Sequence, residues 1–329
     1  MRNFTGLEYI KIAIANGFGL DKLTWDARIN WIDTEYQESM VEALPSSDIH
    51  KVRKAVKALE DAKNGVPTGF IMGLDSCASG IQILSVLIGC RTTAANVNLT
   101  NTGKREDIYQ KVTDTMDSLC GKEITRNMIK KPVMTSCYGS KAQPESVFGK
   151  GTPELQAFHE TLAREIPGAL EVMDDLLSCW DRDAYNYSWT LPDGHVASVD
   201  VTELVDKRIE IDELNHTSFT YRMEINKPST NGIPIIANVT QSVDGYIVRE
   251  MIRRAHKQGF VLLTVHDDFM ASPNNMNKVR ANYIDIMCEI ADSNLLENII
   301  SELLGTKVKV TKRSNNLSKY IRESEYALS

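Results

Sequence analysis

The sequence lacks long apolar stretches, paired cysteines and an excess of basic residues. Its longest apolar run, residues 81–90, is interrupted by Gln82 and Ser85, whereas a membrane-spanning helix needs about 20 apolar residues. The six cysteines include no C-x-x-C pair, so neither a zinc site nor a disulfide framework is indicated. The N-terminal residues also lack the apolar core of a secretion signal. We therefore expect a cytosolic protein with reduced thiols and no membrane span.

The charge composition argues against a stand-alone nucleic-acid binder. There are 37 Lys and Arg residues against 44 Asp and Glu, which gives a net charge of -7. Binding of nucleic-acid phosphates needs clustered basic side chains. The other proportions, 42% apolar and 25% charged residues, are ordinary for a globular chain of about two domains. Because no repeat or linker divides the sequence, we expect its parts to be interwoven.

Periodicity predicts a mainly helical chain with a few strands. Residues 8–63 repeat apolar side chains three and four apart, which is typical of amphipathic helices. Asn64, Gly65 and Pro67 end this helical region. Turn-bounded and alternating patterns predict hairpins at residues 188–196 and 199–226. The further predicted helices are residues 79–88, 105–119, 153–166, 169–180 and 243–258.

Two short apolar runs, residues 69–74 and 260–265, predict buried strands that each lead to a carboxylate. Asp75 follows the first run and Asp267 follows the second. Aspartates brought together in this way can hold two Mg²⁺ ions about 4 Å apart for phosphoryl transfer. On spacing alone, two solvated strand ends explain the pattern equally well.

A basic helix would complete such a site. Arg126 and Lys130 are four residues apart, so on a helix they share a face that can clamp a triphosphate, with Tyr138 about two turns further on. Taken alone, a solvated basic face is the commoner explanation of such a pair. Pro132 removes one backbone donor from this helix at a cost of about 3 kcal/mol. We therefore predict a kink or a helix start near Lys131 and Pro132.

Three motifs, in chain order, resemble the catalytic motifs of the single-subunit RNA polymerases of bacteriophages and mitochondria. Residues 75–82 (DSCASGIQ) resemble the first motif, residues 126–139 the second, and residues 265–267 (VHD) the third. The similarity extends to residues 10–16 and to residues 316–327, which resemble the C-terminal foot of that family. Matches at so many fixed positions are not expected by chance.

The resemblance implies an α+β fold with the palm and fingers of a right-hand polymerase. Residues 1–92 would form the first part of the palm, residues 93–241 the mostly helical fingers, and residues 242–329 the second part of the palm with the foot. Residues 199–228 lie where phage relatives place a promoter-reading hairpin. The N-terminal domain and thumb of the family have no counterpart in this sequence. It therefore resembles the catalytic large subunit of a split, heterodimeric phage RNA polymerase, the alternative being a truncated chain.

The resemblance also assigns roles to particular side chains. Two Mg²⁺ ions would be bound by Asp75 and Asp267, which together with Lys130 and Tyr138 form the catalytic set. Nucleotide binding falls to Arg126, Lys130, Tyr138, Gly80 and Met134. Contact with the template or hybrid falls to Gln241, His266, Tyr109 and Gly139, where Gln241 occupies a position that is usually His in phage enzymes.

Use of ribonucleotides rests on two positions. Family A DNA polymerases carry Glu at the position of Gly80, where its bulk excludes the 2′-hydroxyl that distinguishes RNA from DNA. They also carry an aromatic residue near Met134. Asp268, by contrast, resembles an acidic residue of the DNA polymerases. A family A-like DNA polymerase is therefore the second hypothesis, and a catalytically silent DNA-binding transcription subunit is the third.

The implied function is DNA-templated RNA synthesis in the cytoplasm of an infected bacterial host. The implied partners are a DNA template, an RNA product, ribonucleoside triphosphates and a second polymerase subunit that carries the N-terminal domain and thumb. A single-strand DNA-binding helper is a further candidate partner, and no membrane is expected. The second subunit would supply the basic surface that a net charge of -7 leaves missing.

Overall fold

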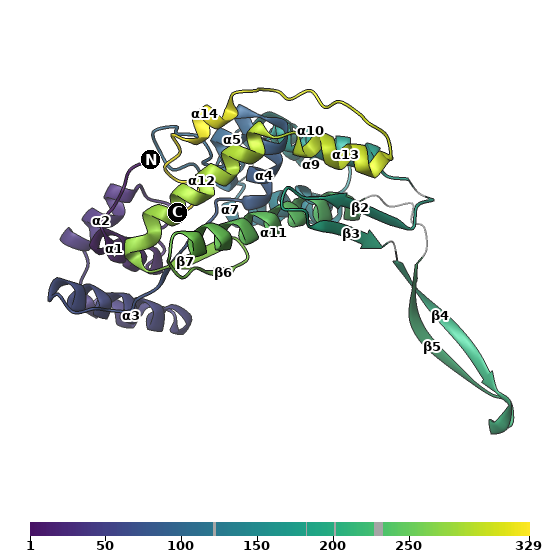
Figure 1. Ribbon diagram of the computed structural model, residues 1–329, viewed down its shortest axis with the longest axis horizontal. Coiled ribbons are helices and arrows are strands. Elements are labelled where there is room, and N and C mark those ends of the chain that lie inside the picture. The colour runs from purple at the N-terminus through teal and green to yellow at the C-terminus, as the bar shows by residue number, and fades with distance from the viewer. Residues whose placement is uncertain (121–122, 182, 201, 227–232) are drawn as a thin grey trace.

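The computed structural model describes residues 1–120, 123–181, 183–200, 202–226 and 233–329. Its N-terminal helices are α1 (Gly6–Gly17), α2 (Trp25–Thr34), the short η1 (Glu38–Ala43) and α3 (Ser46–Lys63) (Figure 1). Thr5 begins α1 with a capping box, because its side chain accepts from the Glu8 amide while the Glu8 carboxylate accepts from the Thr5 amide. Helix α1 packs against both α2 and α3 around a small apolar cluster of its own.

Helix α4 (Ser79–Ile88) is the centre of the main core. Nine of its ten residues are buried, so the longest apolar run of the sequence is a core helix. Four helices pack around it: α5 (Arg91–Asn96), α10 (Pro167–Ser178), α11 (Ile233–Lys257) and α12 (Met276–Asp292). None of the described helices combines the length and apolar character needed to cross a membrane.

A three-stranded antiparallel sheet lies beside this core, in the order β1 (Met72–Asp75), β7 (Asp268–Ala271), β6 (Leu263–Val265). The expectation that the strands leading to Asp75 and Asp267 belong to one antiparallel sheet is confirmed. The two strands are not neighbours, because β7 lies between β1 and β6. The expectation that residues 260–265 are buried is wrong, because Val261 is 73% exposed and Val265 is 59% exposed. The reason is that β6 pairs only with β7 among the described strands and therefore lies at the sheet edge.

A second group of helices spans the middle of the chain. It comprises α6 (Ile108–Cys120), α7 (Arg126–Ser136), α8 (Ala142–Phe148), α9 (Pro153–Glu165) and α10. Helix α7 continues through Pro132, so a helix start at that residue is wrong. The lost amide bond is tolerated because Pro132 itself is buried in the packing of the helix.

Two hairpins follow. The first pairs β2 (Asn186–Thr190) with β3 (Val196–Asp200), and its turn reaches α11. The second pairs β4 (Thr202–Ile211) with β5 (Thr217–Asn226), with the short η2 (Asp212–Leu214) near its tip, and it projects away from the body of the molecule (Figure 1). Both hairpins confirm the sequence-based expectation, although residues 227 and 228 of the second prediction lie outside the described residues.

The C-terminal region returns to the three-stranded sheet of β1, β7 and β6. It comprises η3 (Pro273–Asn275), α12, α13 (Leu295–Leu304) and α14 (Leu317–Ile321). Beyond α14, Leu328 forms an antiparallel bridge with Ser76, and the Ser329 amide donates to the Asp75 carbonyl at 2.9 Å. The Trp25 ring stacks on Tyr326, so residues from both ends of the sequence share one core. This mixture of helices and small antiparallel sheets agrees with the predicted α+β class.

Candidate active site

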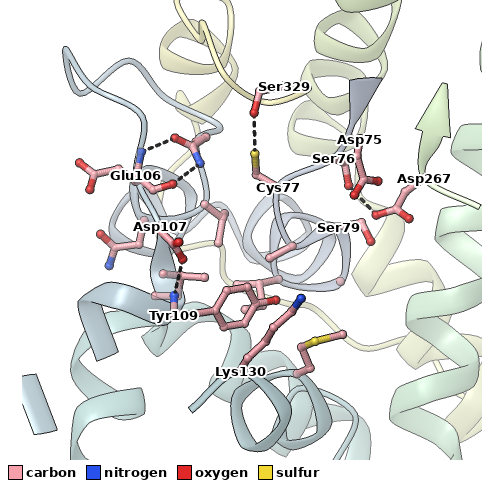
Figure 2. Close-up of a pocket in the computed structure, with 18 of the residues that line it drawn as sticks. Asp75, Ser76, Cys77, Ser79, Glu106, Asp107, Tyr109, Lys130, Asp267 and Ser329 are labelled. Carbon is pink, nitrogen blue, oxygen red and sulfur yellow. Dashed lines mark hydrogen bonds between the residues drawn. The ribbon is translucent and has the colours of Figure 1, made fainter. Parts of the chain in front are cut away.

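The site begins where β1 ends. Asp75 is the last residue of β1, and Asp267 lies in the turn between β6 and β7 (Figure 2). Ser76 links the two segments, since its hydroxyl donates to Asp267 Oδ2 at 2.8 Å and its amide donates to the Asp267 carbonyl at 3.2 Å. His266 has a left-handed backbone with φ of 54°, which allows the chain to reverse at this point. The two predicted metal ligands therefore lie side by side.

Two further carboxylates crowd this pair. Asp268 lies opposite Asp75 in the β1–β7 register, and Asp244 reaches the group from α11. Partial desolvation, followed by the charges of Asp267 and Asp268, raises the pKa of Asp75 to about 6. Desolvation and Asp267 likewise raise the pKa of Asp244 to about 6. Four neighbouring carboxylates repel one another, and bound divalent cations would reduce this repulsion.

Asp268 gives independent support for a cation at this place. Burial and the charge of Asp267 raise its pKa, and its Oδ1 finds no hydrogen-bond partner within the described chain. Gly73 lies directly beneath it, because a Cβ on Gly73 would fall 2.2 Å from Asp268 Oδ1. A buried carboxylate oxygen without a donor and a set of hard oxygen ligands both fit Mg²⁺.

A cavity of about 410 Å³ opens in front of Asp75 and Asp267. In Figure 2 these carboxylates lie on one side of the cavity, while Lys130 and Tyr109 approach from the opposite wall. Most of the predicted site residues line it: Asp75, Gly80, Tyr109, Arg126, Lys130, Met134, Tyr138 and Asp267. Three do not. Gln241 is exposed on α11, His266 is exposed in the β6–β7 turn, and Gly139 follows α7 with φ of 82°.

Helix α7 supplies the basic wall of the cavity. Arg126 is held there by Asp107, with Nε 2.9 Å from Oδ2, and its guanidinium lies 5.3 Å from the centre of the Tyr109 ring. The other oxygen of Asp107 accepts from the Tyr109 amide at 3.0 Å and so caps the start of α6. Lys130 is exposed to the cavity and forms no ion pair with any described residue. Carboxylates on one side and cations on the other match the ends of a metal-bound triphosphate.

Gly80 and Tyr138 touch across the cavity. A Cβ on Gly80 would lie 2.9 Å from the Tyr138 hydroxyl oxygen and 3.3 Å from its Cζ. No side chain other than hydrogen therefore fits at position 80 without movement of Tyr138. The small residue and the ring define the shape of the cavity together.

Sequence reasoning missed several residues of the cavity wall. Lys22 and Arg105 line the cavity, as do Asp107 and Ser329. Arg105 Nε donates to Ser329 Oγ at 2.9 Å, and Ser329 Oγ lies 3.4 Å from Cys77 Sγ, so the C-terminal residues are held beside Asp75. The run of basic residues Lys104 and Arg105 before Asp107 is a signal in the sequence, but its direction toward the cavity depends on the tertiary fold.

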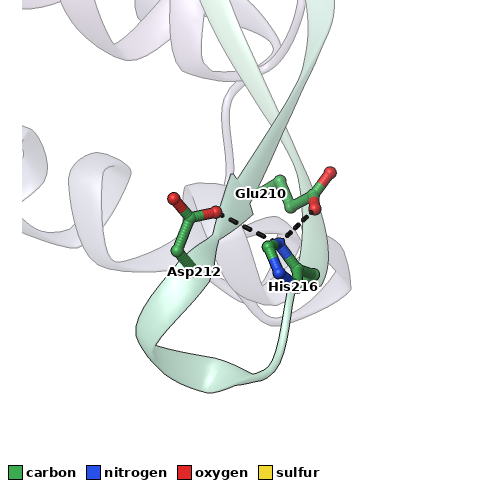
Figure 3. A group of neighbouring side chains, drawn as sticks. All are labelled: Glu210, Asp212 and His216. Carbon is green, nitrogen blue, oxygen red and sulfur yellow. Dashed lines mark ion pairs between the residues drawn. The ribbon is translucent and has the colours of Figure 1, made fainter.

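A different cluster lies at the tip of the β4–β5 hairpin (Figure 3). His216 Nδ1 is 2.9 Å from Glu210 and 3.2 Å from Asp212, and all three residues are exposed. Two carboxylates beside one imidazole form an ion-pair group when the imidazole is protonated. The cluster belongs to the hairpin and not to the carboxylate group around Asp75.

Two comparisons with known proteins agree with this geometry. Residues 3–145 match the family model of DNA-dependent RNA polymerase, and this range includes the first two predicted motifs, all of α7 and part of α8. The chain is also similar to the DNA-directed RNA polymerase of Pseudomonas phage phiKMV, with 26% identity over 172 residues. That alignment covers 41% of this chain and 21% of the phage enzyme, so the chain spans only a small part of its relative. Both comparisons therefore show that part of this chain is similar in sequence to DNA-dependent RNA polymerases, one of which is a phage enzyme.

Proposed function

We propose that the chain catalyses DNA-templated RNA synthesis by two-metal nucleotidyl transfer. The observation that carries the proposal is that Asp75 and Asp267 share one cavity with the basic face of α7. Similarity to phage RNA polymerases supports the same reaction class. An accessory subunit without catalysis is not favoured, because the carboxylates and Lys130 are all in place around the cavity.

In this proposal the acidic residues bind the metal ions and the basic residues bind the triphosphate. Asp75 and Asp267 would hold two Mg²⁺ ions, which when bound activate the attacking 3′-hydroxyl and neutralise the leaving pyrophosphate. Lys130 and Arg126 bind the triphosphate from the opposite wall, where Arg126 is already oriented by Asp107. Tyr138 packs beside the sugar, and Gly80 leaves space for its 2′-hydroxyl. Met134, which is exposed to the cavity, lies near the same end of α7.

Template and partner contacts complete the proposal. Tyr109 and Gly139 would meet the template or hybrid from the fingers, and Gln241 and His266 would meet it from the exposed surfaces outside the cavity. Residues 1–92 and 242–329 act as the palm and residues 93–241 as the fingers, with the hairpin of residues 199–228 placed to contact promoter DNA. A second polymerase subunit supplies the N-terminal domain, the thumb and the basic template surface, with a single-strand DNA-binding helper at initiation. The proposed location is the host cytoplasm.

Extension of an RNA primer on a DNA template tests the proposal. The chain is assayed with Mg²⁺ and either ribonucleotides or deoxynucleotides, alone and with co-purified polypeptides. We expect ribonucleotide addition that requires a second polypeptide and is lost in both Asp75→Asn and Asp267→Asn. Preference for deoxynucleotides would establish the family A-like DNA polymerase instead. Template binding without any addition would establish the accessory subunit.

A further inference from the structure

The two faces of the β4–β5 hairpin differ in chemistry. Residues paired across an antiparallel ribbon share a face, and side chains alternate between faces along each strand. One face therefore carries Asp206–Arg222, Arg208–Thr220 and every second pair along the ribbon, and it is polar except for Leu204, which pairs with Glu224. The pairs between them form the other face, and it is apolar. Its members are Val205, Ile209, Ile211, Phe219, Tyr221, Met223 and Ile225, with Glu203, Lys207 and Thr217 as the polar exceptions.

This apolar face is uncovered. Phe219 is 45% exposed, Ile209 is 44% exposed and Tyr221 is 43% exposed, and none of the other apolar members is buried. The strands pair with each other and make no extensive contact with another described element, so the hairpin stands clear of the body (Figure 1). A two-stranded hairpin is at best marginally stable in water by itself. A contiguous apolar face on such an element indicates an interaction surface.

The charges of the β4–β5 hairpin argue against nucleic acid as the ligand of its apolar face. Residues 202–225 carry six acidic and three basic side chains, and Lys207 is the one cation on the apolar side. Binding of a phosphate backbone needs several cations directed at it. The two arginines lie on the polar face, where Arg222 pairs with Asp206 and Arg208 donates to Ser218. Any contact with DNA therefore belongs to the polar face and leaves the apolar face for another ligand.

The acidic tip of the β4–β5 hairpin indicates that the ligand of the apolar face carries basic side chains. Glu210 and Asp212 are exposed and lie beside His216, which balances their charge only when it is protonated (Figure 3), and the next residue, Glu213, is also exposed. A second copy of this chain would bring the same acidic tip and would be repelled. A protein surface that is apolar at its centre and basic at its rim complements both the face and the tip.

We propose that the apolar face of the β4–β5 hairpin docks onto a second polypeptide of the polymerase, through an apolar surface bordered by basic side chains. This inference rests on the proposed function, because it takes the bound polypeptide to be the second polymerase subunit. The hairpin then serves as a two-sided connector, with DNA on the polar face and protein on the apolar face. Docking would also stabilise an element that is marginal by itself.

Photocrosslinking tests the two faces separately. The tagged chain, carrying p-benzoylphenylalanine in place of Phe219 or of Thr220, is purified with its associated polypeptides and template DNA and then irradiated. We expect position 219 to crosslink to a polypeptide other than this chain, whereas position 220 does not. Crosslinking of position 219 to DNA, to a second copy of the chain, or to nothing at all would each overturn the proposal.

Paired substitutions give a quantitative readout. Ile209→Ser with Phe219→Ser removes one cross-strand apolar pair, and we expect recovery of the second polypeptide to fall at least tenfold. The matched control on the other face is Arg208→Ala with Thr220→Ala, which should leave recovery unchanged. Equal losses in both variants would contradict a face-specific contact. If position 219 crosslinks to a polypeptide but the assembly incorporates no ribonucleotide, the docking proposal stands and the proposed function fails.

Discussion

At the scale of single residues, the cavity depends on close contacts between small and charged side chains. Gly80 is the clearest case, because its missing side chain is what leaves Tyr138 in place. Asp107 is a second, because one carboxylate both caps α6 and orients Arg126. Each contact makes a distinct prediction for nucleotide binding.

Substitution of Gly80 should change the choice of sugar. In Gly80→Ala the new methyl group meets the Tyr138 hydroxyl at 2.9 Å and must displace the ring. We expect the KM for ribonucleotides to rise about tenfold and the KM for deoxynucleotides to rise less, since about 1.4 kcal/mol of lost binding is a factor of ten. Single-nucleotide addition measures both constants. Gly245→Ala is the control, because its Cβ meets only Arg249 at 3.4 Å, and equal effects in the two variants would refute the argument.

Asp107 acts as a positioning residue for Arg126. Asp107→Asn keeps an oxygen that can cap α6 but removes the charge that holds the guanidinium. We expect the KM for ribonucleotides to rise about threefold to tenfold with little change in kcat, because an oriented side chain saves roughly 0.5 to 1.5 kcal/mol of ordering. Steady-state extension kinetics check this. Asp114→Asn, an exposed substitution on the same helix, should have no effect, and a fall in kcat alone would argue for a different role.

Motif residues of the site were predictable from sequence, but the supporting residues were not. Asp75, Lys130 and Tyr138 stand in short patterns with a chemical meaning of their own. Asp244 reaches the site from α11 and Ser329 from the C-terminal segment, and their proximity depends on tertiary packing. The exposed positions of Gln241 and His266 equally depend on how α11 and the β6–β7 turn are oriented.

At the scale of elements, ion pairs join the β2–β3 hairpin to helix α11. Asp193, in the turn between β2 and β3, is almost fully buried and accepts from Arg249 of α11 at 2.6 and 3.2 Å. Arg253 also reaches it at 3.2 Å. These hydrogen bonds hold the pKa of Asp193 well below its usual range. The turn is thereby fixed to the helix that carries Asp244.

Asp193→Asn should weaken the contact between the β2–β3 turn and helix α11. We expect the free energy of unfolding at pH 7 to fall by about 2 kcal/mol, the usual value of hydrogen bonds to a charged group. Since the folded pKa is lowered, the stabilisation is present above about pH 4, the ordinary pKa of Asp, and is lost as the pH falls below it. Urea unfolding at pH 7 and pH 3 measures the difference. Asp183→Asn, in the exposed loop before β2, is the control, and a pH-independent loss in Asp193→Asn would contradict the mechanism.

Element prediction succeeded where periodicity and turns were strong. The helices at 79–88 and 153–166 agree with α4 and α9 to within a residue, because Gly89 marks the end of α4 while Thr152 and Pro153 mark the start of α9. Burial of β6 could not be predicted, since an apolar strand looks the same at the edge and at the centre of a sheet. Of the two alternatives predicted at Pro132, the helix start is wrong because α7 continues through this residue, and the kink stays a prediction.

At the scale of the whole molecule, the raised pKa values of Asp75 and Asp244 make the stability of the protein depend on pH. Asp75 and Asp244 release their protons near pH 6 in the folded chain, but near pH 4 when unfolded. The folded state therefore binds more protons between pH 4 and 6, and the contribution of these groups to stability falls as the pH rises through that window. Above it, all the carboxylates repel one another until a cation binds.

Mg²⁺ should therefore stabilise the protein more at pH 8 than at pH 5. At pH 5 protons occupy Asp75 and Asp244 and compete with the ion, whereas at pH 8 they do not. We expect Mg²⁺ to raise Tm by a few degrees at pH 8 and to have little effect at pH 5. Thermal unfolding with and without MgCl₂ measures this. Asp75→Asn should raise Tm without Mg²⁺ at pH 8 and abolish the response, and an identical response at both pH values would show that the ion binds elsewhere.

The long separation in sequence between the segments that carry Asp75 and Asp267 has a consequence for how the protein folds. The hydrogen bond from Ser76 to Asp267 joins residues 191 positions apart, and β1 pairs with β7 across the same span. Such distant pairings slow folding, because the entropy of closing a long loop is lost before the contacts form. During synthesis on the ribosome, β1 must wait for nearly 200 further residues to emerge before its partner strand β7 exists. Nascent chains thus lack the cavity beside Asp75 and Asp267 until late in translation, after most of the polypeptide has been made.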